Sequence, residues 1–226
     1  MKIGVLLSGS GVYDGAEIHE SVLTLLAIEE AGAEAVCISV DKKQHHVINH
    51  ITGEEQNEER NMMVEAARIA RGDIKAITEV DPADIDMLVI PGGFGSAKNF
   101  TTWAFNGPEG EVLPEVKLML VNMVNIGKPI VALCVSPVVV AKAFEDSEIK
   151  PFMTIGTDKE ESPYDIGGFT EGLAATGVKT TMKKADEINV DRTNKLVTAP
   201  CYMMETNLLT LRKNISDAIK AGIELI

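Results

Sequence analysis

Short aliphatic runs alternate with longer segments whose apolar residues recur at helical spacing from one end of the chain to the other. The runs predict strands at Ile3–Ser8, Ala35–Val40, Met87–Ile90, Pro129–Leu133, Phe152–Ile155, Ile188–Val190 and Leu196–Thr198. The periodic segments predict helices at Ala16–Ala31, Asn57–Arg71, Val112–Ile126, Pro137–Phe144 and Asn207–Leu225. This alternation predicts an α/β fold, a parallel-sheet sandwich with helices on both faces.

The first strand, helix and next strand form a unit of about 38 residues, which is typical of a parallel crossover. Gly32 supplies the stop for the helix. The apolar residues spaced as one face of this helix are Ile18, Val22, Leu25 and Leu26. The polar, histidine-bearing stretch from Lys42 to Gly53 is expected to be a small hairpin or a loop beside the sheet.

Length and composition indicate one globular domain over residues 1–226 with a sizeable core. Hydrophobic residues make up 45% of the chain, which excludes a disordered protein. Thirty-four acidic and 21 basic side chains give a net charge of −13, which argues against nucleic-acid binding. No apolar stretch approaches the roughly 18 residues of a membrane span.

The three cysteines, Cys37, Cys134 and Cys201, form neither a CxxC pair nor a zinc-binding spacing. Their low number suits a reducing compartment. The opening MKIGVLLSGSG contains too short an apolar run for a signal peptide, so we expect a cytoplasmic protein.

Candidate chemistry falls at the carboxyl ends of the predicted strands, where open α/β sheets bind ligands. Cys134 follows a strand directly and precedes a helix, as in a nucleophile elbow, and the helix start is expected to lower the pKa of its thiol. Neither Cys37 nor Cys201 precedes a predicted helix, so Cys134 is expected to be the reactive one. A buried structural cysteine is the alternative.

Two glycine-bearing loops fall at the same edge. The turn Pro91–Gly95 could present backbone amides to an oxyanion, or be an ordinary tight turn. The loop Gly9–Gly15 nearly spells GxGxxG, but Asp14 takes the third glycine's place and no ribose-binding acid follows at the required distance. We therefore expect no nucleotide cofactor.

Two carboxylates, Glu17 and Glu20, lie in the first turns of the helix after this loop. They could be simple partners of the helix dipole, or one could stand beside the thiol and move protons. The four histidines, His19, His45, His46 and His50, all precede Cys134, which removes the ordinary Cys–His arrangement unless an early histidine swings in. His45, His46 and His50 could bind a metal, but a solvated loop is favoured and no metal is expected.

Several strings together resemble the ThiJ/PfpI superfamily, the class I glutamine-amidotransferase-like fold of deglycases, glyoxalases and PfpI peptidases. They include VIPGGFGSAKN, ALCVSP and GAEIHE. Within it, SGSGVYDGAEIHE, HVINHITGE, RNMMVEAARIARG, TIGTD and TAPCYM resemble the ElbB branch, isoprenoid-biosynthesis proteins with an amidotransferase-like domain. The resemblance covers almost the whole chain and implies a single-domain, flavodoxin-like sandwich.

Carried over residue by residue, the resemblance implies that Cys134 is the nucleophile and that the amides of Gly93 and Val135 form the oxyanion hole. The acidic partner falls on Glu20, twelve residues before Gly32, with Glu17 as runner-up. Many members carry a histidine after the cysteine, where this chain has Thr154–Asp158, so peptidase or amidotransferase activity is not expected.

The resemblance implies a cofactor-independent glyoxalase-like or deglycase-like enzyme that converts glyoxal to glycolate or methylglyoxal to lactate. The expected partner is a small dicarbonyl substrate, not nucleic acid or a membrane, and a homodimer is expected because it is common in the fold. A different class of function stays open: a ligand-binding or interaction module in which Cys134 is a redox sensor.

Overall fold

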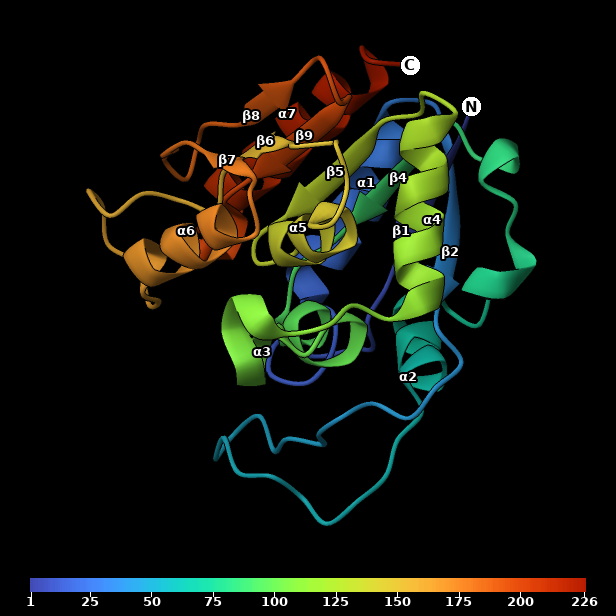
Figure 1. Ribbon diagram of the computed structural model, residues 1–226. Helices are drawn as coiled ribbons and strands as arrows, with labels where there is room; N and C mark the ends of the chain where they lie inside the picture. Colours follow the sequence, from blue (N-terminus) through green and yellow to red (C-terminus); the bar gives the residue numbers. More distant parts are fainter.

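A computed structural model describes all 226 residues and contains a seven-stranded sheet of order β3-β2-β1-β4-β5-β9-β8 (Figure 1). Its strands are β1 (Lys2–Leu6), β2 (Glu34–Ser39), β3 (Lys75–Ala76), β4 (Met87–Ile90), β5 (Ile130–Leu133), β8 (Asn189–Asp191) and β9 (Leu196–Ala199). Neighbouring strands pair in parallel except β8 with β9. The predicted α/β class with a mostly parallel sheet is confirmed.

The strand predicted at Phe152–Ile155 does not join this sheet. It is the short β6 (Phe152–Met153), which pairs in parallel with β7 (Lys179–Thr180) in a separate two-stranded sheet. The Phe152 amide donates to the carboxylate of Asp191 (2.8 Å), which ties this small sheet to the edge strand β8.

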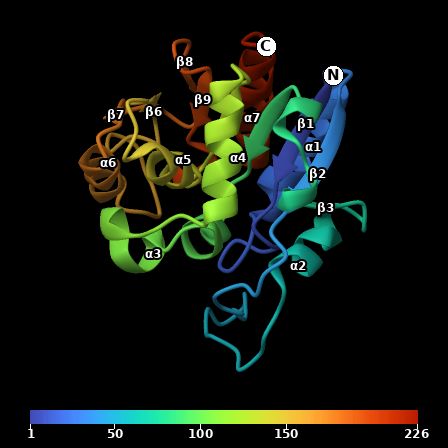
Figure 2. The same cartoon turned by 45° about the vertical axis from the view of Figure 1, so that its right-hand side comes forward.

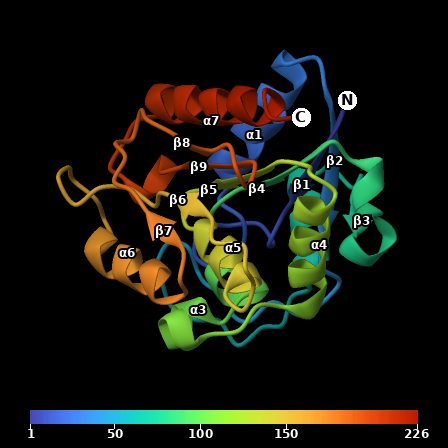
Figure 3. The ribbon, with the colours of Figure 1, turned by 45° about the horizontal axis from the view of Figure 1, so that its top comes forward.

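Helices cover both faces of the main sheet (Figure 3). They are α1 (Ile18–Glu30), α2 (Met62–Ile69), α3 (Trp103–Asn106), α4 (Pro114–Asn125), α5 (Pro137–Phe144), α6 (Ile166–Ala175) and α7 (Leu208–Ile223). Helices α1 and α7 pack together on one face, and α4 and α5 on the other. The helix predicted at Asn57–Arg71 begins late because the Asn61 side chain caps α2, accepting from the Val64 amide (3.0 Å).

One apolar core runs through the molecule. It joins 53 buried residues, and β4 and β5 have no exposed position. Such continuous burial is expected of parallel strands covered on both faces. No helix combines the length and the apolar character needed to cross a membrane.

Helix α1 presents the opposite face to the one its apolar spacing suggests. Ile18, Val22 and Leu26 are 46%, 50% and 39% exposed. The residues that α1 buries are Glu20, Ser21, Thr24, Ala27 and Ile28. The helix is turned so that a carboxylate and two hydroxyls face inward, a rotation that hydrophobic spacing alone does not predict.

The strand order reverses between β1 and β4, which is where doubly wound sheets form their ligand crevice. The segments that follow β1, β4, β5 and β9 therefore meet at one carboxyl edge. The segment 41–61 after β2, which we call the arm, projects from the body as a long excursion (Figures 1 and 2). Two isolated antiparallel bridges, Lys43 with Asn61 and Ile48 with Glu55, give it the hairpin character that was one of the two expectations.

Candidate functional site

Cys134 lies at the predicted sharp turn between β5 and α5. Its backbone is left-handed (φ 57°), its amide donates to the Ala199 carbonyl (2.9 Å), and the residue is only 5% exposed. A non-glycine residue in this conformation costs about 1–2 kcal/mol, so the surrounding structure must hold it. The turn has the geometry of a nucleophile elbow.

The glycine turn after β4 packs so closely against Cys134 that a side chain at Gly92 has no room. A Cβ on Gly92 would lie 2.3 Å from the Cys134 Cβ, 2.7 Å from its Sγ and 2.5 Å from Oε2 of Glu20. Gly93 has φ 97°, and a Cβ there would lie 2.4 Å from the Gly15 carbonyl oxygen. Only glycine allows this approach, which brings the thiol and the carboxyl of Glu20 to the same point.

Glu20 is fully buried, and both of its carboxyl oxygens are held by backbone amides. Oε2 accepts from Gly92 (2.8 Å) and Oε1 from Tyr202 (3.2 Å). The carboxyl also shares a hydrogen bond with the Cys134 thiol. Burial, reinforced by the charge of Glu17, raises the pKa of Glu20 to about 8.

Glu17, three residues before Glu20, caps the start of α1 instead of contacting the thiol. It is the N-cap of α1: its Oε2 accepts from the Glu20 amide (2.7 Å), and its own amide donates to the Gly92 carbonyl (2.9 Å). Burial raises its pKa as well. Of the two candidate carboxylates, the structure places Glu20 against the sulfur and Glu17 at the helix cap.

The family resemblance assigns two backbone amides, those of Gly93 and Val135, to an oxyanion hole. They lie on the two turns that meet at Cys134. Neither Gly93 nor Val135 donates its amide hydrogen to a carbonyl or side-chain oxygen of the protein. The Gly93 amide instead acts as a donor toward the Cys134 sulfur and lowers its pKa. Amides at a buried turn that have no oxygen acceptor are groups that a ligand oxygen can satisfy.

The expected lowering of the Cys134 pKa is wrong. Burial raises this pKa well above its ordinary value, and the neighbouring Glu20 and Cys201 raise it further. The helix start behind the thiol contributes little because Pro137 has no amide hydrogen, and the amides of Ser136 and Val138 donate to the carbonyls of Leu133 and Val135. The resting thiol is therefore protonated at neutral pH.

No histidine swings in to act as a base. His19 is exposed and bonds to the Tyr202 hydroxyl (3.0 Å), His45 and His46 pack around Phe105, and His50 contacts Tyr13 in the glycine loop. None of them is among the groups that shift the pKa of Cys134. No group of three or more His, Cys, Asp and Glu side chains converges to hold a metal ion.

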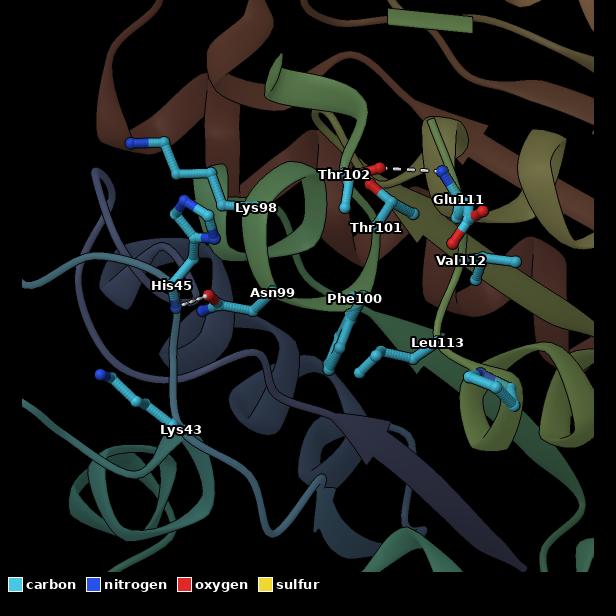
Figure 4. A pocket seen from close by; sticks show the side chains of 11 residues that line it. Lys43, His45, Lys98, Asn99, Phe100, Thr101, Thr102, Glu111, Val112 and Leu113 are labelled. Atoms are coloured by element: carbon cyan, nitrogen blue, oxygen red, sulfur yellow. Dashed lines mark hydrogen bonds between the residues drawn. The ribbon is translucent and has the colours of Figure 1, made fainter. Parts of the chain in front are cut away.

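Two hollows of the surface open between the arm and the segments that follow β4, and Cys134 lines neither of them. One of about 280 Å³, between the arm and the segment before α4, is lined by Lys43, His45 and Lys98 on one side and Thr101, Thr102 and Glu111 on the other (Figure 4). A second, of about 320 Å³, is lined by Tyr13, Phe94 and Lys98 among others.

This second hollow borders the glycine turn 91–95, because Phe94 is one of its lining residues. Phe94 adjoins Gly93, and its ring packs edge-on against Tyr164 (5.6 Å between centroids). Burial, and then the charges of Cys134 and Glu20, raise the pKa of Tyr164 to about 12.

Residues after β9 complete the site, and sequence reasoning gave them no role. The 3₁₀ turn Cys201–Met203 supplies the Tyr202 amide to Glu20 and places the Cys201 sulfur beside the Cys134 amide. Asn214, buried in the middle of α7, accepts from the Cys201 amide (3.1 Å). The string TAPCYM at the end of a predicted strand was the available signal.

Comparisons with known proteins show clear relatives, although no family model matches the chain. Over 226 residues it is 39% identical to the rat ES1 protein homolog, mitochondrial, covering 99% of this chain and 84% of the rat protein. It is equally identical to the human glutamine amidotransferase-like class 1 domain-containing protein 3, mitochondrial, of which it covers 83%.

Solved structures agree with these relatives. The isoprenoid biosynthesis protein with amidotransferase-like domain from Ehrlichia chaffeensis superposes with a TM-score of 0.90 at 32% identity, over 100% of this chain and 99% of that one. Glyoxalase III from Candida albicans superposes with a TM-score of 0.60 at 16% identity, over 98% and 97% of the two chains. This second likeness is one of fold.

The expected cytoplasmic location is wrong by these comparisons. The rat and human relatives are named mitochondrial, and so is a Danio rerio ES1 protein that is 26% identical over 215 residues. Few cysteines without a zinc or disulfide pattern argue against an oxidising compartment, but they do not distinguish between reducing ones.

Proposed function

Because the chain belongs to the family of the ES1 and amidotransferase-like isoprenoid-biosynthesis proteins, within the ThiJ/PfpI superfamily, we propose that it converts small 1,2-dicarbonyls to hydroxy acids through Cys134. Glyoxal would give glycolate and methylglyoxal would give lactate, with water as the only other reactant. The presence of a glyoxalase III among the proteins of the same fold supports this activity.

One observation carries the proposal: a fully buried carboxyl shares a hydrogen bond with a thiol at a strained strand-to-helix turn. Both groups have raised pKa values, so the resting pair at pH 7 holds a proton on each. Because the pKa of Glu20 is the nearer of the two to neutrality, Glu20 is the group that gives up its proton first and becomes the base.

In the first step the Glu20 carboxylate takes the Cys134 thiol proton as the sulfur adds to an aldehyde carbon. The aldehyde oxygen gains the negative charge of the hemithioacetal and is placed to accept from the amides of Gly93 and Val135. These amides have no other acceptor in the protein, so they favour the charged adduct over the free substrate.

In the second step Glu20 first returns the thiol proton to the oxygen of the hemithioacetal and is again a carboxylate. It then takes the proton from the carbon bound to sulfur and delivers it to the neighbouring carbonyl carbon, while the hemithioacetal hydroxyl proton passes to the oxygen of that second carbon. The first carbon is thereby oxidised to a thioester and the second is reduced to an alcohol, so no external oxidant or reductant is required. Water then hydrolyses the thioester and releases the hydroxy acid and the free thiol.

The test is product analysis with glyoxal for the native chain beside Cys134→Ala, a substitution that keeps the Cβ and removes only the sulfur. We expect glycolate from the native chain and none from the variant. Cys37→Ala serves as the matched control, because Cys37 is also buried but lies within β2. Absence of glycolate with the native chain, or equal amounts from Cys134→Ala, would contradict the proposal.

A second function, a ligand-binding module whose Cys134 reports oxidation, is supported by the presence of another cysteine, Cys201, at the end of the strand that pairs with β5. The low exposure and raised pKa of Cys134 slow its oxidation, because oxidants react with accessible thiolates. Peroxide oxidation of Cys134 in a chain that forms no glycolate would favour this module.

A further inference from the structure

Cys201 is a second buried thiol beside Cys134, and the proposed reaction makes no use of it. Cys134 follows β5 and Cys201 follows β9, and these strands are paired in parallel with Leu133 opposite Ala199. Continued by one residue, this register puts Cys134 opposite Pro200, and Cys201 is the next residue along the chain. Since paired strands lie roughly 4.8 Å apart, the two cysteines leave the sheet edge as diagonal neighbours.

Contacts at this edge bring the two residues closer. The Cys134 amide donates to the Ala199 carbonyl (2.9 Å), so the ladder continues as far as Cys134. The two residues also influence each other's titration: Cys201 raises the pKa of Cys134, and the Cys134 amide lowers the pKa of Cys201. Effects of this kind require the two groups to be neighbours.

The backbone at Cys201 is held in a conformation that its side chain disfavours. Four non-glycine residues in the chain have positive φ, and the two that are buried are Cys134 (57°) and Cys201 (48°). The Asn214 side chain, which is not exposed at all, accepts from the Cys201 amide and donates to the Glu187 carbonyl. Strain of about 1–3 kcal/mol, maintained by a buried polar residue, is characteristic of functional positions.

We propose that Cys201 is a resolving thiol, and that oxidation of the site by a hydroperoxide ends in an intramolecular Cys134–Cys201 disulfide. The Cys134 thiol first gives up its proton and its sulfur attacks one peroxide oxygen, which becomes the hydroxyl of a sulfenic acid. The O–O bond breaks, and the other oxygen takes a proton and leaves as an alcohol or, for hydrogen peroxide, as water. The Cys201 sulfur then attacks the sulfenic sulfur, the S–O bond breaks, and its hydroxyl leaves with the Cys201 thiol proton as water. A dithiol reductant restores both thiols.

This disulfide would remove the nucleophile without irreversible damage. A cysteine with no thiol neighbour continues from sulfenic to sulfinic acid, which is irreversible in most proteins. With Cys201 beside it, the sulfenic acid is consumed first. The inference stands on the pairing of β5 with β9 and the backbone at Cys201, so it does not depend on the dicarbonyl activity.

The experiment treats the native chain with hydrogen peroxide and follows intact mass, remaining thiols and the cross-linked peptide. We expect the loss of two hydrogen atoms from the mass, one of the three thiols left, and a peptide pair joining Cys134 to Cys201. Dithiothreitol should restore all three thiols. A matched variant, Cys37→Ser, should still form the disulfide, because Cys37 lies in β2 away from this edge.

Cys201→Ser supplies the complementary measurement. Its Cys134 should label with dimedone at least tenfold more than in the native chain and should accumulate sulfinic acid. Addition of two oxygen atoms to Cys134 in the native chain, with Cys201 still free, would overturn the proposal. A disulfide between two chains, or one that includes Cys37, would overturn it as well. If Cys201→Ser does not fold, the peptide pair and thiol count of the native chain still decide.

Discussion

The glycine turn at 91–95 and the arm at 41–61 leave the same edge of the sheet, but the turn is closely packed and the arm is exposed. The turn lies in contact distance of Cys134, Glu20 and the start of α1, with no room for a further carbon. The arm is exposed over most of its length and is attached by separate hydrogen bonds, such as Ile48 to Asp14 (2.7 Å) and His45 to Asn99 (2.8 Å). The glycine turn fixes the positions of Cys134 and Glu20, whereas the arm lies over the surface of the molecule.

The difference teaches where this molecule tolerates change. A close-packed turn has no relaxed alternative, so a single added methyl must displace backbone or the site itself. Contacts spread along an exposed arm are each worth about 1 kcal/mol, and the loss of one leaves the others in place.

Gly92→Ala should have the largest effect. Its Cβ would lie 2.3 Å from the Cys134 Cβ, so we expect a loss of about 3 kcal/mol in the free energy of unfolding and no detectable glyoxal turnover. Gly53→Ala in the arm is the matched control. Unlike Gly92, Gly53 has positive φ (74°), but no atom lies within 4 Å of the added Cβ, so the substitution should lower the free energy of unfolding by only about 1 kcal/mol. Equal losses in urea unfolding would contradict the contrast.

Glu20→Gln should lower glyoxal turnover by about 100-fold or more, the usual scale for a positioned acid or base. The amide group cannot take the thiol proton, and its nitrogen cannot accept from both Gly92 and Tyr202 as the carboxylate does. Glu17→Gln keeps an oxygen for the α1 cap and should change turnover by less than about fivefold. A larger effect from Glu17→Gln would show that the roles are reversed.

The pH dependence should follow the pKa of Glu20, which is about 8. Turnover should rise with pH through this value as the base loses its proton, and Glu17→Gln should move the midpoint to lower pH because the Glu17 charge raises the Glu20 pKa. A midpoint that stays in place in Glu17→Gln would contradict this coupling.

The same pKa makes folding depend on pH. The pKa of Glu20 is higher in the folded than in the unfolded chain. Its contribution to the free energy of unfolding is therefore fully present below about pH 4.5 and is lost as pH rises through about 8. The loss should exceed about 1 kcal/mol. Denaturant unfolding should show that the free energy of unfolding falls less between pH 4.5 and 8 in Glu20→Gln than in the native chain. An equal fall in the two chains would contradict the raised pKa of Glu20.

Asp14→Ala should have the smallest effect. It removes the acceptor of the Ile48 amide, so we expect a loss of about 1 kcal/mol, faster hydrogen exchange at Ile48 and turnover within about twofold of the native chain. Ile51→Ser, at a position 97% exposed on the arm, should change stability by less than about 0.5 kcal/mol. A collapse of turnover in Asp14→Ala would show that the arm belongs to the site.

Local signals predicted most of the elements. Met87–Ile90 and Pro137–Phe144 have the predicted bounds, and the glycine turn and the cysteine elbow lie at the predicted edge. These features have strong local causes: buried aliphatic runs, a proline that starts a helix, and glycines that stop strands. The choice of Glu20 over Glu17 came from the family resemblance and not from a local signal, and the structure places the Glu20 carboxyl beside the sulfur.

Other features depend on packing that the sequence does not display. The rotation of α1 is set by where Glu20 must lie, so its apolar spacing predicts the wrong buried face. The pKa of Cys134 is raised because burial outweighs the helix start, and burial is a tertiary property. Cys201 enters the site through the pairing of β5 with β9, which joins segments more than sixty residues apart.

The outward apolar face of α1 has a consequence for the behaviour of the protein in solution. Ile18, Val22 and Leu26 face water on a chain of net charge −13, and the repulsion between like-charged copies opposes non-specific association at neutral pH. Near the isoelectric point of about 4.8 that repulsion vanishes while the apolar face stays uncovered. Colloidal stability is therefore lowest under mildly acidic conditions. Glu20 is protonated there, so the fold does not have to bury its negative charge. Precipitation under these conditions therefore reflects association through the surface and not unfolding.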